Sequence, residues 1–245
     1  MPILTYRAGW MACLRHYIIA KLISFHKNKQ AVNHWLLAFS WILYCVSHSV
    51  FAATKVKRHI EKISGRYFRY YRLAYTVWSA IALILVVYFQ YSFTSVVLFN
   101  VVAIGYISLI VLACPGLIVM MMSIVKYFKL LSGVRTLYEA KPAAVLHVKG
   151  LHTYVRHPLY LGTLLFIWGL FFAFPFLNNF IAVMIISLYV LIGIRLEEKK
   201  LLCEFGKDYG EYMARVPKLI PRFSRLAKIK KGNQSAALKL WKYRS

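Results

Sequence analysis

The sequence predicts an all-α fold, a polytopic integral membrane helical bundle of about five transmembrane helices with a C-terminal helical hairpin. Three observations lead to this prediction. Hydrophobic residues make up 60% of the 245 residues, and the mean hydropathy is +0.58. The charged residues fall in blocks that are separated by long runs without Lys, Arg, Asp or Glu. This pattern is typical of proteins that cross a membrane.

The first membrane span is expected at residues 35–53. These 19 residues contain no Lys, Arg, Asp or Glu, and about 17 to 25 apolar residues cross the hydrocarbon core of a bilayer. Residues 1–34 carry five basic residues spread through the segment, with no clear apolar core of a signal peptide. We expect either an interfacial helix or an additional membrane segment there, and the sequence leaves both open.

The next apolar run, residues 73–125, is long enough for two spans. It contains 53 residues without a charged side chain, and we place the turn at residues 90–95. Further along, Cys114-Pro115-Gly116 predicts a kink or an interruption in the third span. Proline removes a backbone hydrogen bond from a helix, and glycine loosens the turn beside it.

The last apolar run, residues 159–194, is expected to fold back on itself. Its 36 charge-free residues contain Phe-Pro-Phe-Leu-Asn-Asn at positions 174–179, which is a turn signal near the middle. Two helices of about 16 residues result, each slightly short for a full span. A hairpin inside the bilayer, shielded by neighbouring helices, therefore fits better than one long tilted helix.

The basic residues predict the orientation in the membrane. With five spans, the segments 54–72, 126–158 and 195–245 share one face and carry 27 of the 32 basic residues. That face is cytoplasmic by the positive-inside rule, which also explains the net charge of +25 without a nucleic acid partner. We expect a membrane core at residues 35–221 and a basic tail at 222–245 that lies on anionic lipid headgroups.

The cysteines do not predict a metal site. Cys13, Cys45, Cys114 and Cys203 stand alone, without the paired spacing of a zinc site or of a disulfide framework.

Two charged motifs flank the predicted hairpin. Arg156 and His157 precede Pro158, which suits the first position of a helix, and Glu197 and Glu198 follow the second helix. Folding at residues 174–179 brings the two motifs to the same membrane face. Carboxylates near membrane depth are costly and usually have a cationic partner. We therefore expect one site that contains both motifs and binds a ligand with a carboxylate and a positive centre.

The spacing of these motifs resembles a known family. Arg-His-Pro-x-Tyr-x-Gly from Arg156, the Glu197-Glu198 pair and Phe-Gly-x-x-Tyr-x-x-Tyr from Phe205 are similar to the signature of the isoprenylcysteine carboxyl methyltransferase and phospholipid methyltransferase superfamily. Residues 47–57, 66–75 and 130–138 resemble its branch of bacterial methanethiol S-methyltransferases and denitrification-associated membrane proteins. Residues 130–138 depart from that branch, because an aspartate-rich start is missing.

The resemblance implies a site for S-adenosyl-L-methionine within residues 150–221, reached from the cytoplasm. It implies that one side of the cofactor pocket is formed by Arg156, His157, Tyr160 and Gly162, and the other by Glu197 and Glu198. His152 and Tyr154 are further candidates from the adjoining loop. If the acceptor is a thiol, a cationic pocket favours its thiolate. Candidates for that charge are Arg135, His152, Arg156 and His157, and His157 is also a candidate general base.

The acceptor remains open between a small thiol and a membrane-dissolved amphiphile, such as a prenylated thiol carboxylate or a lipid amine. A non-catalytic accessory protein of a respiratory system is an alternative, although it has no need to keep the two charged motifs together. A transporter fits less well, because the spans carry few polar groups and no internal repeat. His48, late in the first span, either bonds a neighbouring helix or lines a tunnel for the acceptor.

Overall fold

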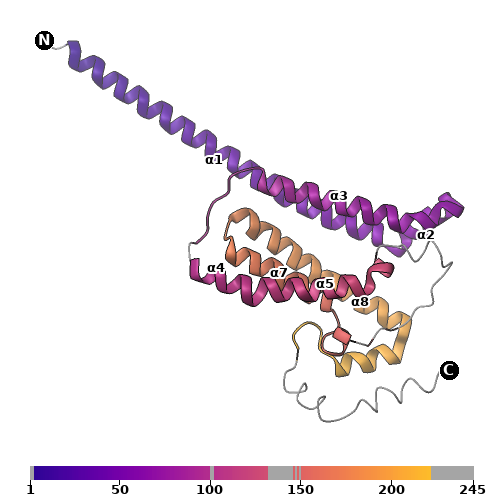
Figure 1. Ribbon diagram of the computed structural model, residues 1–245. Helices are drawn as coiled ribbons and strands as arrows, with labels where there is room; N and C mark the ends of the chain where they lie inside the picture. The colour runs from indigo at the N-terminus through magenta and orange to yellow at the C-terminus, as the bar shows by residue number, and fades with distance from the viewer. Residues whose placement is uncertain (1–2, 100–101, 132–145, 147, 149, 222–245) are drawn as a thin grey trace. The chain divides into compact units, whose positions relative to one another are not determined.

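A computed structural model describes residues 3–99, 102–131, 146, 148 and 150–221 of the chain. Side chains are described at Lys21 and Ser24 and in residues 28–99, 102–126, 146, 148 and 150–221. The described residues fall into two compact units, one within residues 1–102 and 174–188 and the other within residues 103–173 and 189–245. Figure 1 shows the helices along the chain.

The described elements are helical, as the sequence predicts. Among the described residues, four helical segments are long and apolar enough to cross a membrane: Asn28–Ala52, Thr54–Tyr91, Val102–Lys126 and Leu177–Arg215. Pro158–Ala173 is a shorter apolar helix. Across the described residues, extended pairing is confined to a single bridge between Val97 and Phe176. The predicted multi-pass, all-α membrane fold is therefore confirmed, with the predicted turns after Tyr91 and before Leu177.

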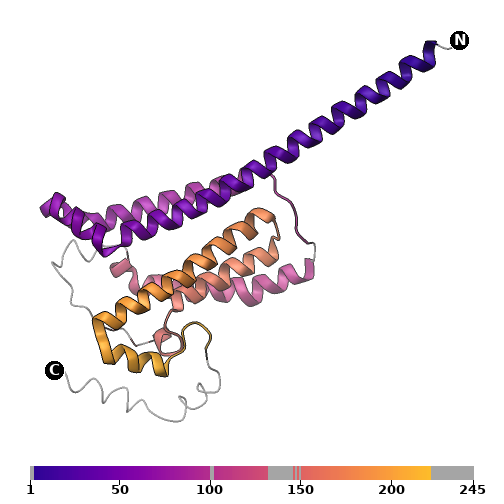
Figure 2. The same cartoon turned by 180° about the vertical axis from the view of Figure 1, so that it is seen from behind.

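In the first unit, helix α1 runs without a break from Ile3 to Ala52. Residues 3–34, for which the sequence left two possibilities, continue the helix of the first span. Helix α3 (Tyr71–Tyr91) lies along the second half of α1, and the first half of α1 extends beyond it, as both Figure 1 and Figure 2 show. Leu37 and Trp41 of α1 pack with Ala182 of helix α8 (Leu177–Arg215) in a buried apolar cluster.

Helix α2 (Thr54–Ser64) and a 3₁₀ segment η1 (Gly65–Tyr70) connect α1 to α3. Neither contains a buried residue. Arg66 and Arg69 lie over the rings of Tyr67 and Tyr70, at 5.2 and 4.7 Å from the ring centroids. This exposed, basic and aromatic composition is typical of a segment at the membrane surface.

Buried polar side chains of the first unit bond one another in what we call the neutral network. Its members are Trp41, Gln90, Asn178 and Asn179. Gln90 Oε1 accepts a hydrogen bond from Trp41 Nε1 at 2.9 Å, and Gln90 Nε2 donates to Asn179 Oδ1 at 2.8 Å. Asn178 Nδ2 donates to the Gln90 carbonyl. Unpaired polar groups at membrane depth cost several kcal/mol, so these bonds select how α1, α3 and the start of α8 pack.

His48 bonds the neighbouring helix α3. Its Nδ1 lies 2.8 Å from Ser79 Oγ, and the Tyr75 hydroxyl donates to the His48 carbonyl at 3.1 Å. This is one of the two roles that the sequence allows for His48. The other, lining a tunnel for the acceptor, stays a prediction.

In the second unit, Pro115 coincides with an interruption of the third span. Helix α4 (Val102–Ser108) passes through a π-helical turn (Leu109–Ala113) into helix α5 (Cys114–Leu131). Because Pro115 has no N–H, it leaves the carbonyl four residues earlier without its α-helical partner, and that carbonyl lies in the π-helical turn. The predicted interruption at Cys114-Pro115-Gly116 is confirmed.

Helix α7 (Pro158–Ala173) packs closely on α5 through glycines. A Cβ atom on Gly162 would lie 2.7 Å from the Met120 nitrogen and 2.9 Å from the Gly116 carbonyl oxygen. Further along α7, a Cβ atom on Gly169 would clash with Ala113. Small residues allow helix backbones to approach closely where lipid gives no hydrophobic drive for association. The start of α7 at Pro158 agrees with the prediction.

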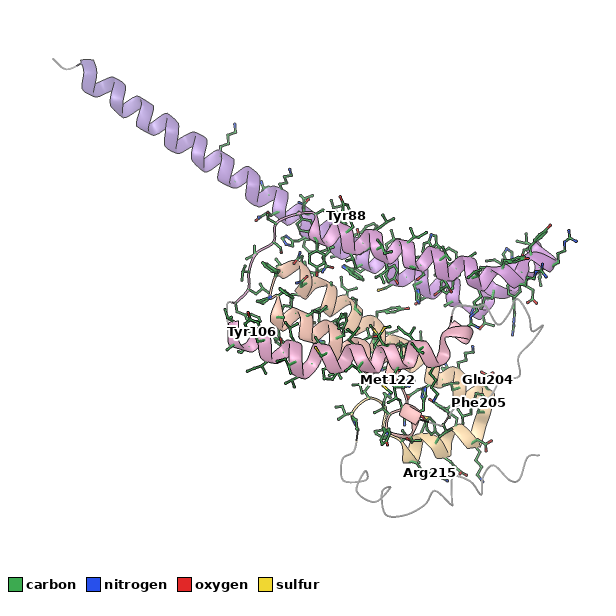
Figure 3. All side chains as sticks on the ribbon, viewed as in Figure 1. Tyr88, Tyr106, Met122, Glu204, Phe205 and Arg215 are labelled. Atoms are coloured by element: carbon green, nitrogen blue, oxygen red, sulfur yellow. The ribbon has the colours of Figure 1, made fainter. Side chains whose placement is uncertain are left out.

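Helix α8 bends at Gly206. This residue has φ of +51° and ψ of −121°, a conformation that side chains with a Cβ rarely adopt. In Figure 3, Glu204 and Phe205 stand just before the bend and Arg215 stands at the end of the segment that follows it. Glu197 and Glu198 are therefore in the interior of a continuous helix and not at its C-terminus, so they do not face the negative end of a helix dipole.

Candidate functional site

The two charged motifs meet in the second unit, in what we call the charged cluster: Arg156, His157, Glu198 and Lys218. Arg156 and His157 lie in the loop that enters α7, and Glu198 lies in α8. Arg156 Nη2 is 2.7 Å from Glu198 Oε1, and both side chains are only 8% exposed. The predicted proximity of the two motifs is thus observed, and it depends on the antiparallel course of α7 and α8.

Arg156 uses most of its hydrogen-bonding capacity inside the protein. Its Nε and Nη2 both bond Glu198 Oε1, and its Nη1 donates to the carbonyls of Met213 and Val216, each at 2.8 Å. A guanidinium group has five N–H donors in a planar fork. With four of them engaged, Arg156 has no edge left for a two-point contact with a ligand carboxylate, and it acts as a clamp on Glu198.

His157 is held by the same carboxylate. Its Nε2 lies 3.2 Å from Glu198 Oε1, and its side chain is 4% exposed. Because an ionised carboxylate only accepts hydrogen bonds, the hydrogen in this contact is on Nε2. In the neutral ring Nδ1 is then the atom that can take a proton, and it lies 3.9 Å from Glu197 Oε2. His157 also faces the ring of Tyr160, with centroids 5.6 Å apart.

The chain beyond α8 closes over these side chains. The Pro217 carbonyl accepts a hydrogen bond from the Arg156 N–H at 2.9 Å, and the Lys218 carbonyl accepts one from the His157 N–H at 3.3 Å. His152 Nδ1 donates to the Arg156 carbonyl at 3.0 Å, and the Tyr212 hydroxyl donates to the His152 carbonyl at 2.7 Å. The backbone on both sides of the charged cluster is therefore positioned by direct bonds.

Two charged side chains at the cluster are accessible from outside. The Glu197 side chain is 45% exposed and the Lys218 side chain 43%, whereas Arg156, His157 and Glu198 are buried. Lys218 Nζ lies 3.1 Å from Glu198 Oε2. A ligand that carries charges of both signs can therefore meet an exposed carboxylate and an exposed ammonium group here.

The other predicted site residues have different surroundings. Tyr160 lies in the first turn of α7, with its hydroxyl 4.0 Å from where a Cβ of Gly193 would be. Gly162 lies in the close contact between α7 and α5, which accounts for a glycine there. Tyr154 is exposed in the entering loop. Arg135 lies outside the described residues. The role of each toward a cofactor stays a prediction.

One residue at the site, Lys218, was not predicted from the sequence, whereas Tyr209 belongs to the motif that carries the family resemblance. Lys218 gave only a weak signal, because it is one of fourteen basic residues between Arg195 and the end of the chain. Tyr209 is 1% exposed, and the described part of the chain supplies no hydrogen-bond partner for its hydroxyl. Its place in the Phe-Gly-x-x-Tyr-x-x-Tyr motif was the available signal. No group of three or more His, Cys, Asp or Glu side chains among the described residues is placed to hold a metal ion.

Comparison with known proteins identifies the family. A family model described as "Protein of unknown function (DUF1295)" matches residues 9–216. The match includes both charged motifs and the helices that position them. No solved structure matches the chain.

Curated relatives carry methyltransferase names. Methanethiol S-methyltransferase of Crocosphaera subtropica is 29% identical over 189 residues, which cover 73% of this chain and 71% of that protein. Methanethiol S-methyltransferase of Pseudomonas deceptionensis is 31% identical over 116 residues, covering 45% and 43%. Methanethiol S-methyltransferase 2 of Bradyrhizobium diazoefficiens is 39% identical over 74 residues, covering 29% and 27%. The resemblance to the methanethiol S-methyltransferase-like branch is confirmed.

Proposed function

Because the chain belongs to the DUF1295 family and resembles proteins named methanethiol S-methyltransferase, we propose that it transfers a methyl group from S-adenosyl-L-methionine to a thiol such as methanethiol. The observation that carries the proposal is the charged cluster. A buried ion pair is costly unless its members are well paired, and here Glu198 is contacted by Arg156, His157 and Lys218. These buried charges, together with the exposed groups of Glu197 and Lys218, suit the binding of a ligand with charges of both signs.

The residues of the site fit the chemistry of S-adenosyl-L-methionine. That molecule has a carboxylate, an ammonium group, ribose hydroxyls and a positively charged sulfur. The exposed Glu197 carboxylate is suited to accept from hydroxyl or ammonium groups, or to compensate the sulfonium charge. Glu198 shapes the site by holding Arg156 and His157, rather than by an open carboxylate edge.

The protein would assist the reaction by alignment and by handling one proton. When bound, S-adenosyl-L-methionine supplies a methyl group that an acceptor sulfur attacks in line, as the bond from that methyl to the sulfonium breaks. His157 Nδ1 would take the proton of the acceptor thiol, because Nε2 already donates to Glu198. The resulting imidazolium would be stabilised by Glu198 and Glu197.

The location would be a cell membrane with the site toward the cytoplasm. The residues of the charged cluster lie next to the basic segments 126–158 and 195–245 in the sequence. The positive-inside rule favours the cytoplasmic face for such segments. S-adenosyl-L-methionine is then available to the site directly from the cytosol.

Binding of radiolabelled S-adenosyl-L-methionine to the detergent-purified full chain tests the proposal. We expect saturable binding by the wild type, about tenfold weaker binding by Glu197→Gln, and unchanged binding by Glu204→Gln, which alters an exposed carboxylate of the same helix. No binding by the wild type would overturn the methyltransferase proposal. Equal binding by all three proteins would remove Glu197 from the site.

The acceptor is tested by headspace measurement of dimethyl sulfide after methanethiol is added with the methyl donor. Formation of dimethyl sulfide by the wild type and its absence with His157→Gln would support a small-thiol acceptor and a proton acceptor at His157. Protein that binds the donor but yields no dimethyl sulfide would point to the other acceptors, a prenylated thiol carboxylate or a lipid amine.

A further inference from the structure

Lys218 is the member of the charged cluster that lies beyond the end of α8. It follows α8 by three residues, and its carbonyl accepts the hydrogen bond from the His157 N–H. The preceding carbonyl, of Pro217, accepts from the Arg156 N–H. The backbone of Lys218 is thus tied to the residues that enter α7, and its Nζ reaches Glu198 Oε2 at 3.1 Å.

The three described cationic or potentially cationic side chains that contact Glu198 differ in what they can still bind. Arg156 is 8% exposed and has four donors engaged within the protein. His157 is 4% exposed, with Nε2 directed to Glu198. Lys218 is 43% exposed, and a contact to Glu198 Oε2 uses only one of the three N–H groups of an ammonium. Among these three, Lys218 is the cation best able to contact an incoming anion.

We propose that Lys218 binds the carboxylate of the methyl donor and makes the site specific for a donor with an intact amino acid end. This inference rests on the proposed function. It assigns the carboxylate contact to Lys218 and not to Arg156, the cation of the motif that enters α7. Arg156 becomes a positioning residue that fixes Glu198, and Glu198 in turn keeps the Lys218 ammonium group at the site.

The two exposed charges would then contact different groups of the ligand. Lys218 offers a positive group and Glu197 a negative group, and both lie beside His157 or its partner Glu198. A donor whose carboxylate meets Lys218 has its ammonium or sulfonium centre available to Glu197. The lysine ammonium group is a compact charge on a flexible stem, so it can hold a carboxylate without bidentate geometry.

The test compares two ligands, S-adenosyl-L-methionine and its decarboxylated analogue, S-adenosyl-3-methylthiopropylamine. Affinities are measured by equilibrium dialysis for the full-length wild type, Lys218→Met, Lys218→Arg and the control Lys207→Met, an exposed lysine of α8. We expect the wild type to prefer the carboxylated ligand by about tenfold or more, the size of one charge-assisted hydrogen bond. Lys218→Met should lose that preference, because only its affinity for the carboxylated ligand should fall. Lys218→Arg and Lys207→Met should keep the preference.

The outcomes separate this inference from the proposed function. A wild type that binds both ligands equally would overturn the assignment of Lys218 and leave the methyltransferase proposal intact. Equal weakening of both ligands by Lys218→Met would also overturn it, because the lysine would then act only by supporting Glu198. Binding of neither ligand to the wild type would overturn the proposed function and the assignment together.

Discussion

The neutral network and the charged cluster both supply hydrogen-bond partners to buried polar side chains, but the first does so with uncharged groups and the second with ionised ones. In the first unit, Gln90, Asn178 and Asn179 bond one another and Trp41 without any formal charge. In the second unit, Arg156 and Glu198 bury formal charges that neutral side chains would avoid. Uncharged hydrogen bonds are sufficient to hold helices together. The buried charges of the second unit are therefore better explained by ligand binding than by helix packing.

The largest expected effect comes from removing Glu198. Glu198→Ala leaves Arg156 buried without its carboxylate, and breaking a buried ion pair costs about 3 to 5 kcal/mol. We expect a large loss in the free energy of unfolding, measured in mixed detergent micelles, together with loss of donor binding. The matched control Glu204→Ala removes an exposed carboxylate of α8 and should change stability by less than about 0.5 kcal/mol. A stable Glu198→Ala protein would contradict the central role of this pair.

A smaller effect is expected from the glycine contact behind the charged cluster. Gly162→Ala places a Cβ 2.7 Å from a backbone nitrogen of α5, which cannot move aside as a side chain could. Overpacking of this kind costs about 3 kcal/mol. Gly210→Ala is the control, because its added Cβ would meet no described atom within 4 Å outside its own turns of helix, and alanine should stabilise that helix by up to about 1 kcal/mol. Equal melting temperatures of the two variants would exclude close packing of α7 on α5.

The smallest effect on stability is expected from a change in the neutral network, which should leave donor binding at the charged cluster intact. Gln90→Leu removes the partner of Trp41 Nε1 and of Asn179 Oδ1, which should lower the free energy of unfolding by about 2 kcal/mol. Affinity for S-adenosyl-L-methionine, measured on the protein that remains folded at low temperature, should stay within about twofold of the wild type. Loss of affinity larger than the loss of stability would mean that the neutral network also serves the ligand site.

Local signals in the sequence were sufficient for most of the fold. The lengths of the charge-free runs predicted the apolar helices, because the bilayer sets how many residues cross it. Pro158 predicted the start of α7, and residues 174–179 predicted the turn before α8. Proline acts on its own turn of the chain, so its effect needs no knowledge of distant partners.

The proximity of Arg156 and Glu198 could also be predicted from a local signal, the turn at residues 174–179. Once the chain turns at residues 174–179, the returning helix brings the second motif back to the start of α7, where the first motif lies. What local signals could not show is how many partners each charged group has. The carbonyls of Met213 and Val216 engage Arg156 only because α8 bends at Gly206 and the following chain closes over the loop before α7.

The sequence by itself determined an all-helical membrane protein, its turns, and the meeting of two charged motifs on one face. These follow from apolar length, proline geometry and charge placement, which act over a few turns of helix. The tertiary structure decided which charges are buried and which face outward. It made Arg156 a clamp, left Glu197 and Lys218 exposed, and placed Gly162 against α5. Burial and hydrogen-bond capacity depend on atoms from segments far apart in the chain, and only their packing supplies them.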